Sequence, residues 1–407
     1  MNWQLAWRNI WRNPRRTSVI LVAVIIGVWS MIFLGALNRG TIEGMVSNAI
    51  STLTGHMQVH LKGYREDPAI ENSITRPEKV EEVFNRILPS DASWTSRIRV
   101  NAVASNARHY SGVTLVGIDP IREAGVSFIG SAVSEGRYLE PDDDNAILVG
   151  AAFIEKFGTR LGRKLVLMSQ DSKKDIASRA FRIVGVFDAE MDSTEKQFVF
   201  INRSTAQEML KLENGVSEFA VFFKDEDELT AIADEIKSAL PSDQFETHTW
   251  GELLPIMTAM LRIMDGFIYI WTLVTFVAMG FGIVNTTLMA VFERMREFGI
   301  LKSLGMRPWR IVRGVLTESF ILLLMGMAGG NLLAVLTTWP LARSGIDLSA
   351  LAAGAEYAGM TRMIYPLINS RDVLVANLIV LLLGLLVSLY PAIKAARFKP
   401  VEAMVYN

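Results

Sequence analysis

Four stretches without a charged residue constrain the fold of this 407-residue chain more than any other feature of its sequence. Charged residues make up 20% of the chain, so a random window of about 21 residues holds about four of them. The charge-free stretches are Thr17–Asn38, Gly266–Phe292, Ser319–Ala342 and Val373–Ile393. A helix needs about 20 apolar residues to cross the hydrocarbon core of a membrane. Because four runs of this length do not suit a soluble core, we predict four transmembrane helices, at 17–38, 266–292, 319–342 and 373–393.

The charged residues between these spans predict a topology. The segments 1–16, 293–318 and 394–407 together hold 13 basic and 4 acidic residues, whereas residues 39–265 hold 25 basic and 35 acidic ones. Cytoplasmic loops of membrane proteins carry the excess of Lys and Arg. We therefore expect both termini and the 293–318 loop in the cytoplasm, and the 39–265 region and the 343–372 loop outside. The long first apolar run favours a retained anchor over a cleaved signal peptide.

Composition and motifs argue against catalysis by this chain. A formal net charge of −1 excludes a generally basic nucleic-acid-binding protein, and the absence of cysteine excludes disulfides, thiol nucleophiles and Cys-ligated metals. His56 and His60 lack the glutamate of a zinc protease motif, so we expect ordinary exposed polar residues. Asp142–Asp144 predicts a solvated turn, and no Walker A motif occurs. We expect no catalytic, cofactor-binding or metal-binding residue.

The 39–265 region predicts an α+β domain. Helical patterns cover Glu78–Leu88, Ser204–Leu212 with Ser204 as the N-cap, and Glu226–Leu240. Short β-rich runs predict strands at 98–103, 113–118, 146–149, 164–168, 181–187, 197–201, 218–223 and 245–249. Since the helical patterns cluster towards the two ends, we expect a β-rich subdomain at about 121–200. The chain is thus predicted to be a membrane α-helical protein with a large α+β domain inserted between helices 1 and 2.

Two helix-compatible stretches, Thr41–Thr54 and Gly251–Asp265, adjoin the first two spans and predict helical stalks. In the second stretch an apolar row recurs at helical spacing, formed by Leu253, Met257, Met260, Leu261 and Met264. Two interpretations stay open: the row packs on the first stalk, or it is an adaptable surface that contacts a lipid or hydrophobic cargo.

Polar and small residues within the spans predict helix packing. The polar ones are Asn285, Thr286, Thr287, Asn331, Thr337 and Thr338, for which we favour a structural role over contact with a substrate. Gly326 and Gly330 form a pair with the spacing that allows two helices to approach closely.

The cytoplasmic loop predicts a short helix over residues 293–304, ended by Gly305 and followed by a new helix at Pro308. An i, i+3 row of apolar residues runs along it, consisting of Met295, Phe298, Leu301 and Leu304. Because apolar and charged groups are both displayed, we favour a helix that docks on a protein. The alternative is a solvated basic helix near anionic lipid.

This loop, Glu293-Arg-x-Arg-Glu-Phe-Gly-Ile-Leu-Lys-x-Leu-Gly305, resembles the signature loop of the FtsX-like permeases of ABC transporters. Two further motifs are similar to the same family: the tail Tyr390-Pro-Ala-Ile-Lys-Ala-Ala-Arg-Phe-Lys-Pro400-Val-Glu-Ala and the opening Ala6-Trp-Arg-Asn-Ile-Trp-Arg-Asn-Pro-Arg-Arg16. In the outer domain, the motifs at 117–120, 135–139 and 181–187 resemble the lipoprotein-releasing (Lol-type) branch. The resemblance covers essentially the whole chain.

The resemblance implies a non-catalytic permease of the bacterial inner membrane. Two permease chains, identical or related, would pair on a cytoplasmic ABC ATPase dimer and move a lipoprotein or other hydrophobic cargo, with a periplasmic carrier or adaptor. The docking residues carried over by position are Glu293, Arg296, Glu297, Gly299, Leu301, Leu304 and Gly305. The alternatives are a MacB-like efflux permease for peptides or drugs, and an FtsX-like mechanotransmitting scaffold that controls an extracytoplasmic enzyme.

Overall fold

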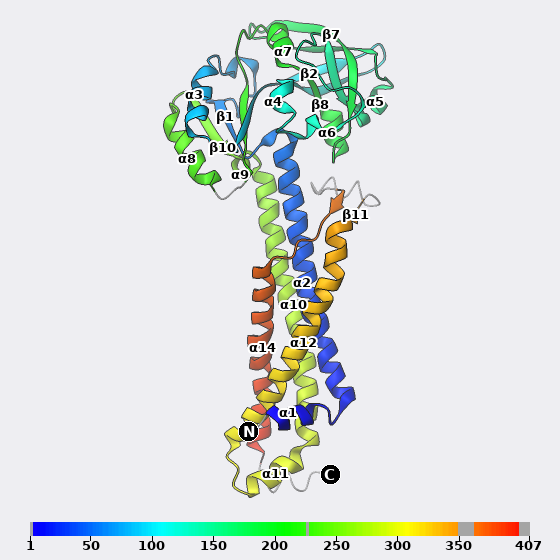
Figure 1. Cartoon of the computed structure of the whole chain (residues 1–407), viewed down its shortest axis with the longest axis vertical. Coiled ribbons are helices and arrows are strands. Elements are labelled where there is room, and N and C mark those ends of the chain that lie inside the picture. The colour runs from blue at the N-terminus through cyan, green and yellow to red at the C-terminus, as the bar shows by residue number, and fades with distance from the viewer. Residues whose placement is uncertain (1–2, 225–227, 349–361, 399–407) are drawn as a thin grey trace. The chain divides into compact units, whose positions relative to one another are not determined.

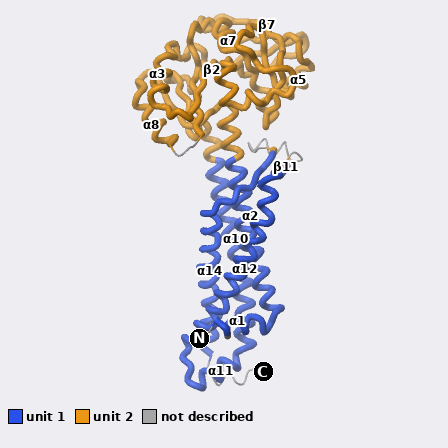
Figure 2. Tube along the Cα trace, in the orientation of Figure 1, with its two compact units in different colours: residues 1–43, 260–347, 363–407 blue, residues 44–259, 348–362 orange. Residues whose placement is uncertain are grey.

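A computed structural model describes residues 3–224, 228–348 and 362–398 of the chain (Figure 1). The chain divides into two compact units (Figure 2). The helical unit contains residues 1–43, 260–347 and 363–407, and the α+β unit contains residues 44–259 and 348–362. Residues 349–361 of the expected external loop and residues 399–407 of the expected tail lie outside the described residues.

Four long helices make up most of the helical unit, and they run alongside one another in Figure 1. They are α2 (Pro14–Ala49), α10 (Pro255–Glu293), α12 (Pro308–Ser344) and α14 (Ser370–Arg397). Each contains one charge-free stretch, and each is long and apolar enough to cross a membrane. The short helix α1 (Trp3–Ile10) precedes α2, the short helix α11 (Met295–Ser303) separates α10 from α12, and β11 (Ile346–Asp347) pairs with β12 (Met363–Ile364).

The predicted glycine pair lies where α12 meets α2. A Cβ atom on Gly326 would lie 2.5 Å from Cγ1 of Val24, and one on Gly330 would lie 2.7 Å from Cβ of Val28. Any larger residue at these two positions would push the helices apart. The prediction of close helix packing at this pair is confirmed.

Polar residues also join the helices. The side-chain amides of Asn331 on α12 and Asn377 on α14 donate to each other's oxygens, at 2.9 and 3.0 Å. Thr337 accepts a 3.0 Å hydrogen bond from Nε1 of Trp29 on α2. These contacts confirm the structural interpretation of Asn331 and Thr337, whereas Asn377 was not singled out from the sequence.

One mixed sheet forms the centre of the α+β unit. Its strands are β1 (Met57–Leu61), β2 (Ser93–Ser105), β3 (Tyr110–Ile118), β4 (Val133–Gly136), β5 (Ala146–Gly150), β6 (Lys164–Gln170), β7 (Ile176–Phe187), β8 (Phe198–Asn202), β9 (Glu218–Phe222) and β10 (Phe245–Thr249). They are ordered β10-β1-β9-β2-β3-β8-β5-β7-β4, and β6 pairs with β2 and β7. The β3–β8 and β5–β7 pairs are parallel.

Strand β2 connects two hydrophobic cores because it pairs with different strands along its length. Residues 93–97 pair with β9, and residues 98–105 pair with β3. The first core lies between β1, β9 and β10 and the helices α3 (Glu78–Ile87) and α8 (Leu229–Ala239). The second contains residues of β2, β3 and β5–β8, so the strands expected at about 121–200 share it with strands that precede them.

Shorter elements complete the unit, and several differ from the predictions. They are η1 (Ile50–Thr54), η2 (Ile70–Asn72), α4 (Pro120–Glu123), η3 (Phe128–Gly130), α5 (Ala151–Phe157), α6 (Asp192–Gln197), α7 (Arg203–Leu210) and α9 (Trp250–Leu253). No strand was predicted where β1 and β4 lie, and no helix was predicted where α5 and α6 lie. The expected N-cap role of Ser204 is wrong, because Asn202 is the N-cap residue of α7 and forms no side-chain capping bond.

The two stretches next to the first spans are helical for most of their length. Helix α2 continues to Ala49 and is followed by the π-helical turn η1. The second stretch is interrupted at Leu254, whose φ of −118° and ψ of 62° are not helical, and α10 then begins at Pro255. Proline suits the first turn of a helix because its missing N–H would have had no partner there.

Candidate coupling surface

Helix α11 is set off from its neighbours by two backbone breaks. Arg294, between α10 and α11, has a φ of −106° and a ψ of 14°. After α11, Gly305 has a φ of +86°, in the left-handed region that favours glycine, and Pro308 is the first residue of α12. The predicted short helix, its glycine stop and the new start at Pro308 are confirmed.

One side of α11 packs on the rest of the helical unit. Met295 and Phe298 are buried, and Phe298 lies in a cluster with Val291 of α10, Val312 of α12 and Ala395 of α14. Leu301 packs against the edge of this cluster. The ammonium group of Lys302 donates to the carbonyl oxygens of Ala396 and Phe398, at 2.8 and 2.6 Å. The helix is therefore held against α12 and the end of α14.

The other side of α11 is exposed. Leu304 is 79% exposed and Ile300 is 46% exposed, and Arg296 lies on the surface beside them. The predicted i, i+3 row thus divides between an inward and an outward side. Of the residues carried over from the family, Arg296, Leu304 and Gly305 are exposed, Gly299 is buried and Leu301 is half-buried. Ile300, which was not among them, adds apolar surface between Arg296 and Leu304.

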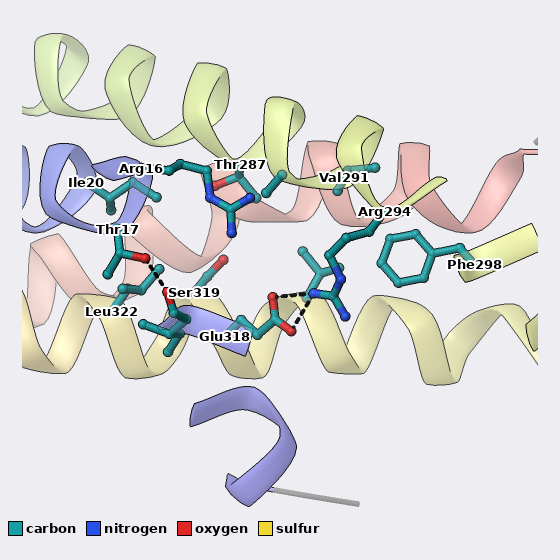
Figure 3. A pocket seen from close by; sticks show the side chains of 13 residues that line it. Arg16, Thr17, Ile20, Thr287, Val291, Arg294, Phe298, Glu318, Ser319 and Leu322 are labelled. Atoms are coloured by element: carbon teal, nitrogen blue, oxygen red, sulfur yellow. Dashed lines mark hydrogen bonds and ion pairs between the residues drawn. The ribbon is translucent and has the colours of Figure 1, made fainter. Parts of the chain in front are cut away.

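The remaining two carried-over residues, Glu293 and Glu297, form ion pairs. Arg16 Nη1 lies 2.9 Å from Oε2 of Glu293. Glu297 pairs with both Arg12 and Arg294. Arg294 also holds Glu318 of α12 through two hydrogen bonds, at 2.8 and 3.0 Å (Figure 3). All three glutamates of the 293–318 loop therefore pair with arginines, two of which come from the N-terminal segment.

The asparagine Asn9 on α1 completes this network, since its side-chain nitrogen donates to Glu318 at 2.7 Å. Burial disfavours the charge of Arg294, but Glu318 and Glu297 outweigh it and hold the pKa of Arg294 above its ordinary value. Burial likewise opposes the charge of Glu297, but hydrogen bonds from Arg12 and Arg294 lower its pKa. Both groups are therefore charged at neutral pH.

A cavity of about 30 Å³, enough for about one water molecule, lies beside this network. Its lining includes Arg16 and Thr17 of α2, Thr287 of α10, and Ser319 of α12 (Figure 3). The ion pairs and the cavity together mark the place where the ends of α2, α10, α11 and α12 meet.

The apolar row expected near the second span is half-buried at each of its five positions, Leu253, Met257, Met260, Leu261 and Met264. The exposed large side chains in this part of α10 are different ones. Ile256 is 86% exposed, and Ile263 and Phe267 are also on the surface.

The histidines are less exposed than predicted. His60 is buried, with Nε2 at 2.9 Å from Oε1 of Gln58, and the half-buried His56 accepts a hydrogen bond from the backbone N–H of Phe223. The expectation of exposed polar side chains is wrong, because both flank or occupy β1, which the prediction did not contain. Within 3–224, 228–348 and 362–398, no group of three or more His, Asp or Glu residues could hold a metal ion.

A second arginine cluster lies in the α+β unit, and it was not predicted from the sequence. Arg97 on β2 is fully buried and pairs with Glu123 at 2.7 Å and with Glu218 at 3.4 Å. It also donates to the carbonyl oxygen of Leu53 in η1. Burial opposes the charge of Arg97, but the two glutamates outweigh it and raise its pKa.

Leu53 itself has a φ of +79°, which is unusual for a non-glycine residue. Its side chain is nevertheless buried in a cluster that includes Val116 and Phe200. The Arg97 bond and this burial hold η1, the turn that ends the first helical stretch, on the sheet. No sequence signal marks Arg97, because arginine is seldom buried.

Comparison with known proteins adds evidence from sequence. A family model described as MacB-like periplasmic core domain matches residues 17–239, and one described as FtsX-like permease C-terminal matches residues 269–400. The second match includes α11 and the ends of the helices around it.

Individual relatives have low sequence identity to this chain, but the similarity extends over most of its length. The lipoprotein-releasing system transmembrane protein LolC of Xylella fastidiosa is 25% identical over 335 residues, which cover 78% of this chain and 79% of that protein. The pyoverdine export ATP-binding/permease protein PvdT of Pseudomonas fluorescens is 24% identical over 98% of this chain and 58% of its own length. The crystal structure of the periplasmic region of MacB from Actinobacillus actinomycetemcomitans covers 53% of this chain and 97% of that one, with 14% identity and a TM-score of 0.36.

Proposed function

Because the chain belongs to the FtsX-like permeases of ABC transporters and carries a MacB-like periplasmic core domain, we propose that it couples ATP hydrolysis on a separate ATPase to cargo movement at the outer face of the membrane. It is a transmembrane permease with a large extracytoplasmic domain, and its family implies an ATPase partner. The proposed cargo is a lipoprotein or another hydrophobic molecule.

The observation that carries this proposal is the construction of α11. Its inner side is fixed by Phe298 and Lys302, and its N-terminal end is held by the Arg294–Glu318 pair. Its outer side presents Ile300 and Leu304 beside the cation of Arg296. An apolar centre with a charged edge is the composition of a protein-docking surface, and a firmly held helix can transmit force. We propose that the ATPase docks here.

The proposed orientation places α1 and α11 in the cytoplasm and the α+β unit in the periplasm. The excess of basic residues around α1, α11 and the tail supports it. We further propose that two such chains, identical or related, share one ATPase dimer, and that a periplasmic carrier or adaptor receives the cargo. The likeness to LolC supports a lipoprotein cargo.

A second candidate is export of a small molecule. The likeness to PvdT, a pyoverdine export protein, extends over 98% of this chain and favours this alternative. The two candidates differ in what accumulates when the chain is depleted: lipoproteins retained in the inner membrane, or a small molecule retained in the cell.

The docking proposal is tested with Leu304→Glu in the full-length chain co-expressed with its ATPase. A carboxylate in the centre of an apolar contact must be desolvated, so we expect loss of ATPase co-purification and of cargo-stimulated ATP hydrolysis. The matched control is Ile176→Glu, which places the same charge on an 83% exposed aliphatic residue of the α+β unit. A Leu304→Glu complex that co-purified and transported like the control would contradict docking at α11.

A further inference from the structure

Three tryptophans form an exposed row at the start of the chain. Trp3, Trp7 and Trp11 are spaced four residues apart, and their exposed fractions are 62%, 47% and 49%. The rings of Trp7 and Trp11 meet edge to face with centroids 5.9 Å apart. Tryptophan is a side chain that soluble surfaces seldom expose in groups, so this row requires an apolar or interfacial partner.

Contacts between α1 and α12 set the position of this row along the long axis of α12. Ala6 and Ile10 are buried against Ile321 of α12, and the ring of Trp3 lies edge to face against Phe320, with centroids 5.9 Å apart. Phe320 is the second residue of the charge-free stretch of α12, where the apolar part of that helix begins. The tryptophans thus lie level with the boundary between membrane and cytoplasm, where tryptophan is enriched in membrane proteins.

The charged residues near the three tryptophans favour a negatively charged lipid as the partner of this row. Arg8 and Arg15 are exposed, and the described part of the chain offers their guanidinium groups no carboxylate partner. The neighbouring Arg12 and Arg16, in contrast, pair with Glu297 and Glu293. The first acidic residue of the sequence is Glu43. A helix with tryptophans on one side and unpaired arginines beside them has the composition of an interfacial helix on an anionic membrane surface.

We propose that Trp3, Trp7, Trp11, Arg8 and Arg15 form a binding surface for anionic phospholipid headgroups of the cytoplasmic leaflet. The arginines bind the phosphates and the indole rings lie among the glycerol and upper acyl groups. The inference rests on the orientation given under the proposed function. It adds a role for α1: the lipid holds in place the segment from which Arg12 and Arg16 reach Glu297 and Glu293 next to α11.

The test uses the full-length chain without ATPase in lipid nanodiscs. Since the chain has no cysteine, Gln4→Cys on the exposed part of α1 gives a single site for an environment-sensitive fluorophore. Brominated phosphatidylglycerol and brominated phosphatidylcholine are then compared as quenchers at equal fractions. We expect stronger quenching by phosphatidylglycerol, and a fall in its local enrichment of about fivefold on Arg8→Gln or Arg15→Gln.

Two controls separate this surface from general effects. Arg371→Gln removes an exposed arginine at the start of α14, and Trp339→Ala removes a 59% exposed tryptophan near the other end of α12. Neither should change the preference, whereas Trp7→Ala with Trp11→Ala should weaken quenching by both lipids. Equal quenching by the two lipids would overturn the proposal, and so would a label shielded from both, which would indicate a protein partner. Because no ATPase is present, either result leaves the Leu304→Glu test of docking unaffected.

Discussion

Each unit contains an arginine paired with two glutamates beside a break in a long helix, but the two clusters differ in burial. Around Arg97 the three side chains are 0–1% exposed, and the arginine also holds the turn that follows α2. Around Arg294 the side chains of Arg294 and Glu318 are 17% and 16% exposed, and Glu297 is 42% exposed. A fully buried charge cannot lose its partner without a large penalty, whereas a partly hydrated one can exchange partners with water. We infer that the first cluster mainly stabilises the fold of its unit, whereas the second mainly holds α11 in place.

The largest effect should follow Arg97→Met, because it leaves Glu123 buried without its cation and Glu218 with only the half-exposed Arg99, 3.9 Å away. Breaking a buried ion pair costs about 3–5 kcal/mol, which corresponds to a fall in Tm of about 10 °C for a unit of this size. The measurement is thermal unfolding of the full-length protein in detergent. Arg99→Met removes only the long, half-exposed ion pair of the same strand with Glu218, so it serves as the comparison and should change Tm by no more than about 2 °C. Equal Tm values for the two variants would show that full burial of the Arg97 ion pairs adds nothing to the stability of the unit.

Glu318→Gln should leave stability nearly unchanged but reduce coupling. Glutamine can still accept the hydrogen bond from Asn9, but Arg294 loses a charged partner worth about 1.5 kcal/mol, or about tenfold in an equilibrium. We therefore expect cargo-stimulated ATP hydrolysis to fall about tenfold while Tm falls by no more than about 4 °C. The charge exchange Arg294→Glu with Glu318→Arg should restore part of the activity lost by either change alone. A fall in Tm as large as that of Arg97→Met would show that this cluster also fixes the fold.

Arg12→Gln should have a smaller effect, because Arg12 and Glu297 are 65% and 42% exposed and water screens their attraction. We expect a loss of coupling of less than about threefold. Raising the salt concentration should produce a similar loss in the parent protein and little further change in the variant. The same ATP hydrolysis assay at low and high salt provides the measurement. A loss of about tenfold in the Arg12→Gln variant at either salt concentration would contradict the prediction.

The smallest expected effect is that of pH on the attachment of α11. The pKa of Glu297 is lowered in the folded protein, so its ion pairs stabilise the attachment of α11 above the ordinary glutamate pKa of about 4.3 and lose this contribution as pH falls through the folded value. Hydrogen exchange of the amides of residues 295–303, corrected for intrinsic rates, should therefore be constant between about pH 8 and pH 6. Loosening of α11 within this range would point to a titrating group other than Glu297.

In the helical unit, the helices were predicted from the sequence more fully than the ion pairs that connect them. A span follows from the length of a charge-free run, and close packing follows from the spacing of Gly326 and Gly330. The partners of the loop glutamates were not predicted, because Arg12 and Arg16 lie far from them in sequence and only the fold brings them together. The i, i+3 row of α11 is wrong as a single surface, because Met295 and Phe298 are buried whereas Leu304, which follows the last helical residue, is exposed.

In the α+β unit, most strands were predicted, whereas β1 was not. Met57, Val59 and Leu61 alternate with Gln58 and His60, so β1 carries a strand pattern that the prediction overlooked. The burial of its two polar residues does not follow from that pattern. Arg97 was missed for a related reason: its burial depends on Glu123 and Glu218, which come from other elements. Buried polar partners are set by tertiary structure, and local sequence carries little information about them.

The place of β1 in the sheet also sets an order for folding. Among the described strands, this one pairs with β9 and β10 alone, so Met57 meets Val221 and Thr249, more than 160 residues further along the chain. Strands β2 to β8 pair among themselves and can form their core while the chain is still being synthesised. The first strand to be made must wait, unpaired, until nearly the whole domain has been translocated. A nascent chain stalled before residue 218 would therefore present β1 as an unpaired strand, open to chaperones and proteases.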